Sequence, residues 1–239
     1  MGSTSKKANA LTREQEIVAS KIFGRHVDQK KAILLFVGAL ILAACPMIMG
    51  ARLYDRIPEI VETGLVSVTG EDDSLPRWAL VFLLPGIFTL GTIICHAQLW
   101  ICQKKQKLPP TPVRLLGRWT VAVISVFFSS WAISRGADFP LSGMFYIYLL
   151  LACILLIAGG HFYGCSKDAA VAIRSDFTKL RDRNWNAVHN SVGLCCFAAG
   201  IIICFAAMLS DSVPPVVSII IALLVILPDP LCHLLLKNK

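Results

Sequence analysis

Ionisable side chains within apolar sequence are the residues of this chain that could carry chemistry. Asp229 lies between Pro228 and Pro230 in a long apolar stretch. A carboxylate in hydrocarbon is costly and normally faces a bundle interior or water, and the two prolines would break a helix and free backbone carbonyls. Asp229 with His96 or His189 could therefore form a polar site open to the cytoplasm, as in the broken helices of transporters. The alternative is that Asp229 and the histidines reach the membrane interface.

Other catalytic and metal-binding patterns are absent from the sequence. The five histidines belong to different segments, and no His-x₃-His pair occurs on any of them. The nine cysteines lie within or at the ends of apolar segments without a Cys-x-x-Cys pair, so we interpret them as small apolar fillers between helices. No carboxylate pair, glycine-rich phosphate loop or Ser/His/Asp arrangement is present. We expect a protein that is not an enzyme and holds no metal or cofactor.

Six apolar stretches must position these residues. The chain of 239 residues is 56% hydrophobic and only 16% charged, whereas a soluble domain is nearer a quarter charged. About 20 apolar residues are needed for a helix to cross a bilayer. The sequence predicts an all-α polytopic membrane protein whose helices lie at 32–51, 78–102, 119–134, 144–164, 188–209 and 216–236. The third stretch is the weakest, because it is short and carries four serines.

The basic residues indicate how these helices are oriented. With a cytoplasmic N-terminus and six crossings, nineteen Lys and Arg residues lie on the cytoplasmic side, and only Arg52, Arg56, Arg77 and Arg135 lie outside. Loops rich in Lys and Arg resist translocation, so this split predicts that both termini are cytoplasmic. The net charge of +8 is explained by this topology more simply than by nucleic-acid binding.

The connections differ in charge between the two sides. The outside loop 52–77 has six acidic and three basic residues, whereas the inside loop 165–187 has five basic residues. Three prolines in the other inside loop, Pro109, Pro110 and Pro112, predict polyproline geometry. Residues 1–31 are predicted to form a cytoplasmic amphipathic segment, with a capping box at Thr12.

Tryptophans and glycines support the helix assignment. All five tryptophans lie near predicted helix ends, where their amphipathic rings favour the membrane interface: Trp78, Trp100, Trp119, Trp131 and Trp185. Gly159, Gly193 and Gly200 are expected to allow helices to approach closely.

Two motifs resemble known bacterial membrane families. Tyr54 and Pro58 in Leu-Tyr-x-x-Ile-Pro, followed by Gly70 and Asp73 in Gly-Glu-Asp-Asp, resemble a membrane domain of unknown function, without the His and Asn found in that domain's loop. The C-terminal half resembles the SdpI family, through Ile-Arg-Ser around Arg174 and then Trp185, His189 and Gly193. The second group has the spacing i, i+4, i+8 and lies on one helix face.

The resemblance implies a two-helix domain at 32–110 followed by a four-helix SdpI-like domain at 111–239. Members of such families include an immunity protein that protects a cell from its own toxic peptide and holds a transcriptional repressor at the membrane. The resemblance thus implies the bacterial cytoplasmic membrane as location, with an extracellular peptide and a cytoplasmic regulator as partners beside the lipid bilayer. A small transporter built around Asp229 and a purely structural or regulatory subunit are the alternatives.

Overall fold

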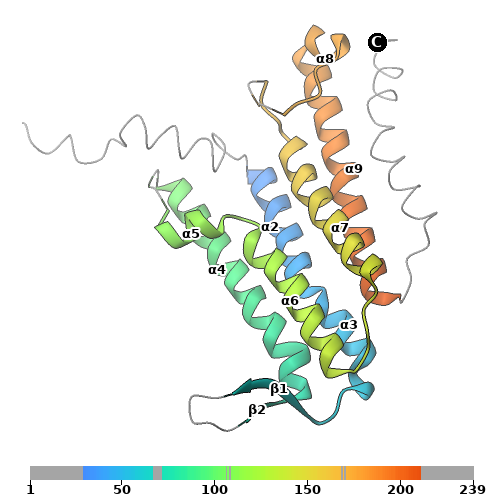
Figure 1. Ribbon diagram of the computed structural model, residues 1–239. Coiled ribbons are helices and arrows are strands. Elements are labelled where there is room, and N and C mark those ends of the chain that lie inside the picture. Colours follow the sequence, from blue (N-terminus) through green and yellow to red (C-terminus); the bar gives the residue numbers. More distant parts are fainter. Residues whose placement is uncertain are drawn as a thin grey trace, which may run out of the picture.

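The computed structural model describes residues 29–66, 72–105, 107, 109–167, 169 and 171–210. Asp229, the sixth predicted crossing at 216–236 and the amphipathic segment predicted within 1–31 lie outside these residues. The structure is mostly helical (Figure 1). Its elements are α2 (Gln29–Ala44), α3 (Pro46–Leu53), η1 (Tyr54–Arg56), β1 (Ile60–Val66), β2 (Asp72–Pro76), η2 (Ala79–Leu83), α4 (Leu84–Lys104), α5 (Thr111–Leu116), α6 (Thr120–Gly136), α7 (Gly143–Phe162), α8 (Asp176–Leu180) and α9 (Asp182–Leu209).

Four helices are long and apolar enough to cross a membrane: Gln29–Arg56, Ala79–Lys104, Gly143–Phe162 and Asp182–Leu209. They contain the stretches predicted at 32–51 and 188–209, all but Trp78 of 78–102, and all but Tyr163 and Gly164 of 144–164. The predicted stretch 119–134 forms α6, a shorter apolar helix that packs against α2, α3 and α4. Figure 1 shows the five as a bundle, with α7 lying along α9.

The first of these helices is interrupted between α2 and α3. Pro46 has no backbone N–H to donate, so the helical hydrogen-bond pattern is interrupted at Cys45, although the backbone of Cys45 keeps helical dihedral angles. The Cys45 thiol lies 3.1 Å from the Cys204 sulfur on α9. Both cysteines are buried, so this pair lies in the bundle interior as a contact between small side chains, consistent with the predicted filler role.

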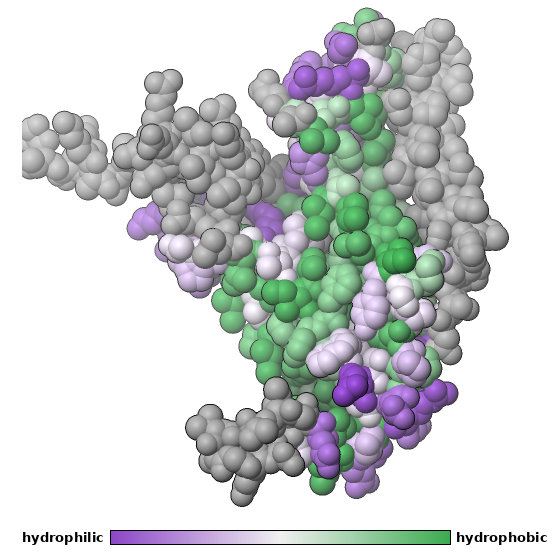
Figure 2. Space-filling view, in the orientation of Figure 1, coloured by the Kyte–Doolittle hydropathy of each residue, from purple (hydrophilic) through white to green (hydrophobic). Residues whose placement is uncertain are grey.

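The surface of the bundle is apolar along its middle. Large exposed side chains line the outer faces of α4, α6, α7 and α9, among them Ile87, Leu90, Phe128, Ile147 and Leu150. Figure 2 shows this hydrophobic band between hydrophilic groups at the two ends. A soluble monomer rarely exposes such a continuous apolar surface, whereas a lipid environment requires one. Together with the four long helices, the band indicates a membrane protein.

The serines of α6 explain why the sequence of this helix looked weak. Ser125, Ser129, Ser130 and Ser134 are all buried, so the polar face points into the bundle and the apolar face points out. Ser125 donates a hydrogen bond of 2.7 Å to the Ala43 carbonyl, beside the break in the first helix. Within the described residues the Ser129 hydroxyl has no hydrogen-bond partner.

Two loops contain regular structure that the sequence did not predict. Residues 60–76 include a two-stranded antiparallel sheet, in which Ile60 pairs with Pro76 and Val61 with Leu75, so the all-α prediction is incomplete. The polyproline prediction for 109–112 is wrong beyond Pro110: Pro112 lies in the first turn of α5, where a missing N–H costs nothing. The hairpin and the short helices α5 and α8 lie at opposite ends of the bundle (Figure 1).

The two ends differ in charge. Among the described positions, the end with α5 and α8 has twelve basic and two acidic residues, and the hairpin end has four basic and six acidic residues. The basic positions of the first end are Lys30, Lys31, Lys104, Lys105, Lys107, Arg114, Arg118, Lys167, Arg174, Lys179, Arg181 and Arg183. The basic and acidic groups of residues that the sequence assigns to opposite sides thus lie at opposite ends of the bundle.

Glycines bring α7 and α9 into direct backbone contact, as predicted. A Cβ atom on Gly159 would lie 2.8 Å from the Gly193 carbonyl oxygen and 2.8 Å from the Phe197 nitrogen. A Cβ atom on Gly200 would lie 3.0 Å from the Ala152 oxygen. Backbone atoms cannot rotate away as a side chain can, so each added methyl group would push the helices apart.

We predict that Gly159→Ala lowers the free energy of unfolding by about 1–3 kcal/mol through overpacking. Gly86→Ala is the matched control, because its Cβ would meet only the Met47 methyl group, at 3.7 Å. It should be neutral or stabilising, since Ala is the better helix former. The measurement is unfolding of the purified protein in detergent. Equal stability of the two variants would show that the α7–α9 contact has room for a side chain.

Candidate functional site

The two motif residues Trp185 and His189 form a stacked pair at the start of α9. Their ring centroids are 4.1 Å apart, and the His189 side chain is fully buried. Nε2 of His189 accepts a hydrogen bond of 3.0 Å from the Ile173 N–H, so Nδ1 carries the proton and donates to the Trp185 carbonyl at 2.9 Å. Nε2 therefore attaches the loop before α8 to α9, and the Nδ1 bond, which lies within α9, fixes the orientation of the ring.

Three further side chains of α9 bind the same loop through its backbone. The indole N–H of Trp185 donates to the Cys165 carbonyl at 2.8 Å, and the Asn190 side-chain oxygen accepts from the Gly164 N–H at 2.8 Å. Asn184 donates to the Phe177 carbonyl at 3.1 Å. We call residues 163–181, held in this way, the anchored loop. Burial of the Cys165 thiol raises its pKa, which makes it unreactive.

Sequence reasoning missed several residues that hold the anchored loop, Asn184 and Asn190 among them. Ser175 and Thr178 form a capping box at the start of α8, and the Thr178 hydroxyl also donates to the Ile173 carbonyl at 3.0 Å. The spacing of Ser175 and Thr178, three residues apart, is the signal that could have revealed this cap.

Arg174, the third motif residue of this half, points away from His189. Its side chain is exposed and donates to the Ala169 carbonyl at 3.0 Å. Lys167 forms an ion pair with Asp182, whereas Lys179, Arg181 and Arg183 are exposed. The anchored loop and the start of α9 therefore present a basic surface on a backbone that buried side chains hold in place.

One correction concerns the tryptophans. Trp78, Trp100 and Trp131 are at least half exposed near helix ends, as interfacial residues should be. Trp185 is only 5% exposed, so its role is to pack on His189 and not to anchor the protein at the interface. Trp185 does lie near a helix end, as predicted, but it is buried in the protein and does not lie at the membrane interface.

At the opposite end, Tyr54 lies under an arginine of the hairpin. The Arg77 guanidinium lies 4.6 Å from the Tyr54 ring centroid, and 4.0 Å from the Glu59 carboxylate. Pro58 is exposed in the turn between η1 and β1. Asp73 lies in β2, and Gly70 is outside the described residues.

Arginines at the hairpin end stack on aromatic rings, while the carboxylates face outward. Arg52 and Arg56 both lie over Phe139, at 5.9 and 5.6 Å from its ring centroid. The nearby carboxylates belong to Asp55, Glu59 and Glu62, which are exposed. Arg52 and Arg56 are exposed as well, so the net charge of this end follows from its six acidic and four basic described residues.

The structure does not bring His96 and His189 into one site. His189 is occupied by the anchored loop, whereas Nε2 of His96 donates to the Arg118 carbonyl at 3.0 Å, and its ring lies 5.4 Å from that of Phe36. Asp229 is outside the described residues. Of the two histidines, both among the described residues, His96 lines a cavity.

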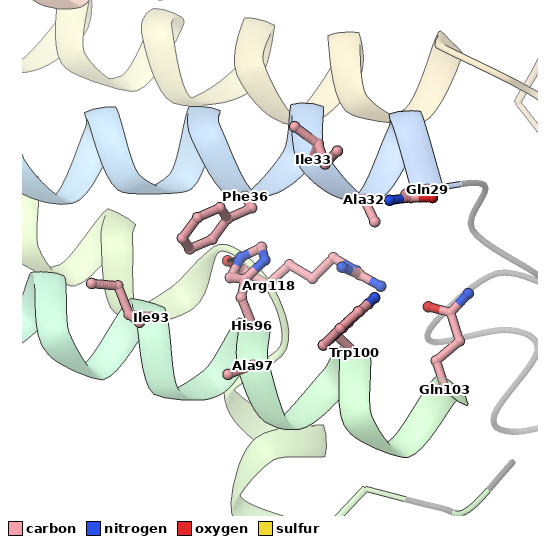
Figure 3. Close-up of a pocket in the computed structure, with 10 residues that line it drawn as sticks. All are labelled: Gln29, Ala32, Ile33, Phe36, Ile93, His96, Ala97, Trp100, Gln103 and Arg118. Atoms are coloured by element: carbon pink, nitrogen blue, oxygen red, sulfur yellow. Dashed lines mark hydrogen bonds between the residues drawn. The ribbon is translucent and has the colours of Figure 1, made fainter. Parts of the chain in front are cut away.

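That cavity lies between α2 and α4 near the basic end and has a volume of about 290 Å³ (Figure 3). Arg118, from the connection between α5 and α6, reaches into it, and burial lowers the pKa of its guanidinium. Arginine nevertheless stays protonated at physiological pH. The lining residues are Gln29, Ala32, Ile33, Phe36, Ile93, His96, Ala97, Trp100, Gln103 and Arg118.

Comparison with protein families, with curated proteins and with solved structures finds no match to this chain. The functional interpretation therefore depends on the geometry of the two ends and on the motifs themselves.

We predict that His189→Ala loosens the anchored loop. The substitution removes the hydrogen-bond partner of the part-buried Ile173 N–H, at a cost of about 1–3 kcal/mol. Trypsin should then cleave the loop at Arg174 and Lys179 faster than in the wild type. His96→Ala is the control, because it removes a histidine that does not contact the loop. Equal cleavage rates in all three proteins would contradict the role assigned to His189.

Proposed function

We propose that the chain is a multi-pass protein of the bacterial cytoplasmic membrane, of the SdpI type and not an enzyme, with its hairpin end outside and its basic end in the cytoplasm. The distribution of charge supports this orientation most directly. Twelve of the sixteen basic residues in the described positions lie at one end. Lys and Arg are enriched in cytoplasmic loops.

The hairpin end is proposed to recognise a cationic toxic or antimicrobial peptide. The outward carboxylates of Asp55, Glu59 and Glu62 would attract such a peptide. The arginines of this end offset only part of this charge, because the described positions hold six acidic and four basic residues. A two-stranded hairpin is marginal by itself, and here β1 packs against the end of α6. This packing favours a fixed surface for recognition.

The anchored loop is proposed to engage a cytoplasmic regulator. Its backbone is held by His189, Trp185 and two asparagines, so that the exposed basic side chains of Arg181 and Arg183 are presented from a fixed surface. The two motifs lie in these two regions: Tyr54 and Pro58, which resemble the membrane domain of unknown function, at the hairpin, and the Trp185–His189 pair, which resembles the SdpI family, at the loop. The location of both motifs in these regions supports the resemblance. Each motif covers a short segment of the chain.

The peptide proposal is tested by survival of a sensitive bacterium that expresses the protein. The wild type should protect against a secreted cationic peptide. The triple variant Asp55→Asn, Glu59→Gln, Glu62→Gln should require about fivefold less peptide for killing, if each exposed charge contributes about 0.3 kcal/mol.

The control is Asp182→Asn, which removes one negative charge at the opposite end and breaks only the ion pair to Lys167. It should protect like the wild type, and protection should weaken in high salt. Equal survival of cells with and without the wild-type protein, at equal expression, would refute the immunity function. Full protection by the triple variant would refute the role of the hairpin carboxylates.

A further inference from the structure

The cavity between α2 and α4 changes from polar to apolar with depth. Gln103 and Gln29 lie at the ends of the two helices, and Ile93 and Phe36 lie about 15 and 10 Å farther along them, at about 1.5 Å per residue. Figure 3 shows the Arg118 guanidinium and both glutamines at one end of the cavity and the Phe36 and Ile93 side chains at the other. A ligand that fits must have a polar head and an apolar body.

The polar end carries positive charge for which the described part of the chain offers no matching carboxylate. Among the described residues no acidic group lies within 4 Å of the Arg118 guanidinium, which is partly withdrawn from water. Lys31 lies close enough to add to the positive potential there. A partly desolvated cation is stabilised most by an anion that forms charge-assisted hydrogen bonds, and guanidinium groups match phosphate oxygens well.

The cavity also opens sideways onto the apolar band. Ile33 and Trp100 in its wall are 54% and 56% exposed, so the apolar part is continuous with the surface that faces lipid. Trp100 lies one turn from the end of α4, at the depth where tryptophan meets lipid headgroups. An acyl chain could thus enter from the bilayer without crossing polar surface.

We propose that this cavity is a binding site for an anionic phospholipid of the leaflet on the basic side. Its phosphate binds the Arg118 guanidinium, and one acyl chain lies along Ile33, Phe36 and Ile93. The excess of basic residues at this end favours a lipid with net negative charge over a zwitterionic one. His96 positions the site, because its hydrogen bond holds the Arg118 backbone against α4. The site is independent of what the hairpin recognises.

The test is lipid binding to the purified full-length protein in detergent, measured by native mass spectrometry with phosphatidylglycerol and phosphatidylcholine. The wild type should prefer phosphatidylglycerol, and Arg118→Gln should bind it about tenfold more weakly, the loss expected for one charge-assisted hydrogen bond. Arg118→Lys should retain most of the preference, since it keeps the charge. Arg135→Gln removes an arginine at the opposite end and should bind like the wild type.

A second variant tests the apolar wall. Ala97→Leu adds bulk to the cavity and should weaken binding of both lipids, whereas Ala198→Leu adds the same bulk to an exposed position on α9 and should not. Three results would overturn the proposal: no phosphatidylglycerol retained by the wild type, equal binding of the two lipids, or unchanged binding in both Arg118→Gln and Ala97→Leu. Displacement of the lipid by inorganic phosphate alone would also overturn it, because the acyl chain would then contribute nothing.

Discussion

The direct contact of backbones between α7 and α9 is the interaction on which the rest of the structure depends. It exists because Gly159, Gly193 and Gly200 have no side chains to separate the helices. In a bilayer, apolar side chains gain little by leaving lipid, so close packing of this kind replaces the hydrophobic effect as the source of helix association. The contact also sets where α9 begins relative to the end of α7. That relation places Trp185 and His189 against the intervening loop.

The other helices follow the same principle: apolar side chains face outward, and small or polar side chains face inward. The serines of α6 face inward, and Ser125 binds a carbonyl beside the break of the first helix. The paired thiols of Cys45 and Cys204 join that break to α9. The bundle thus holds its two ends in fixed positions, one carrying the hairpin and the other the anchored loop and the cavity at Arg118.

The positions of the apolar helices could be predicted from the sequence, because hydrocarbon thickness and composition determine them almost alone. The hairpin could not be predicted, since Ile60–Val66 and Asp72–Pro76 lack a clear alternation of polar and apolar residues and are stabilised by packing on the bundle.

The pairing of Trp185 with His189 could be predicted from the helical spacing of these two residues. The partners of His189 could not be predicted, because the Ile173 N–H lies in a loop whose path no periodicity predicts. The cavity was equally hidden, since Arg118 reaches it from a connection between helices. Among its lining residues the sequence pointed to His96 as a polar group and to Trp100 only as an interfacial residue.

The account assigns recognition to the hairpin end and signalling to the basic end, so its central claim is the orientation of the bundle in the membrane. This claim is tested most directly by single added cysteines and a membrane-impermeant maleimide applied to intact cells. Glu62→Cys, in the hairpin, should be labelled from outside, and Lys179→Cys, in α8, only after the cells are permeabilised, with the wild-type chain measuring labelling of the native cysteines. The reverse pattern would place the hairpin in the cytoplasm and contradict the account.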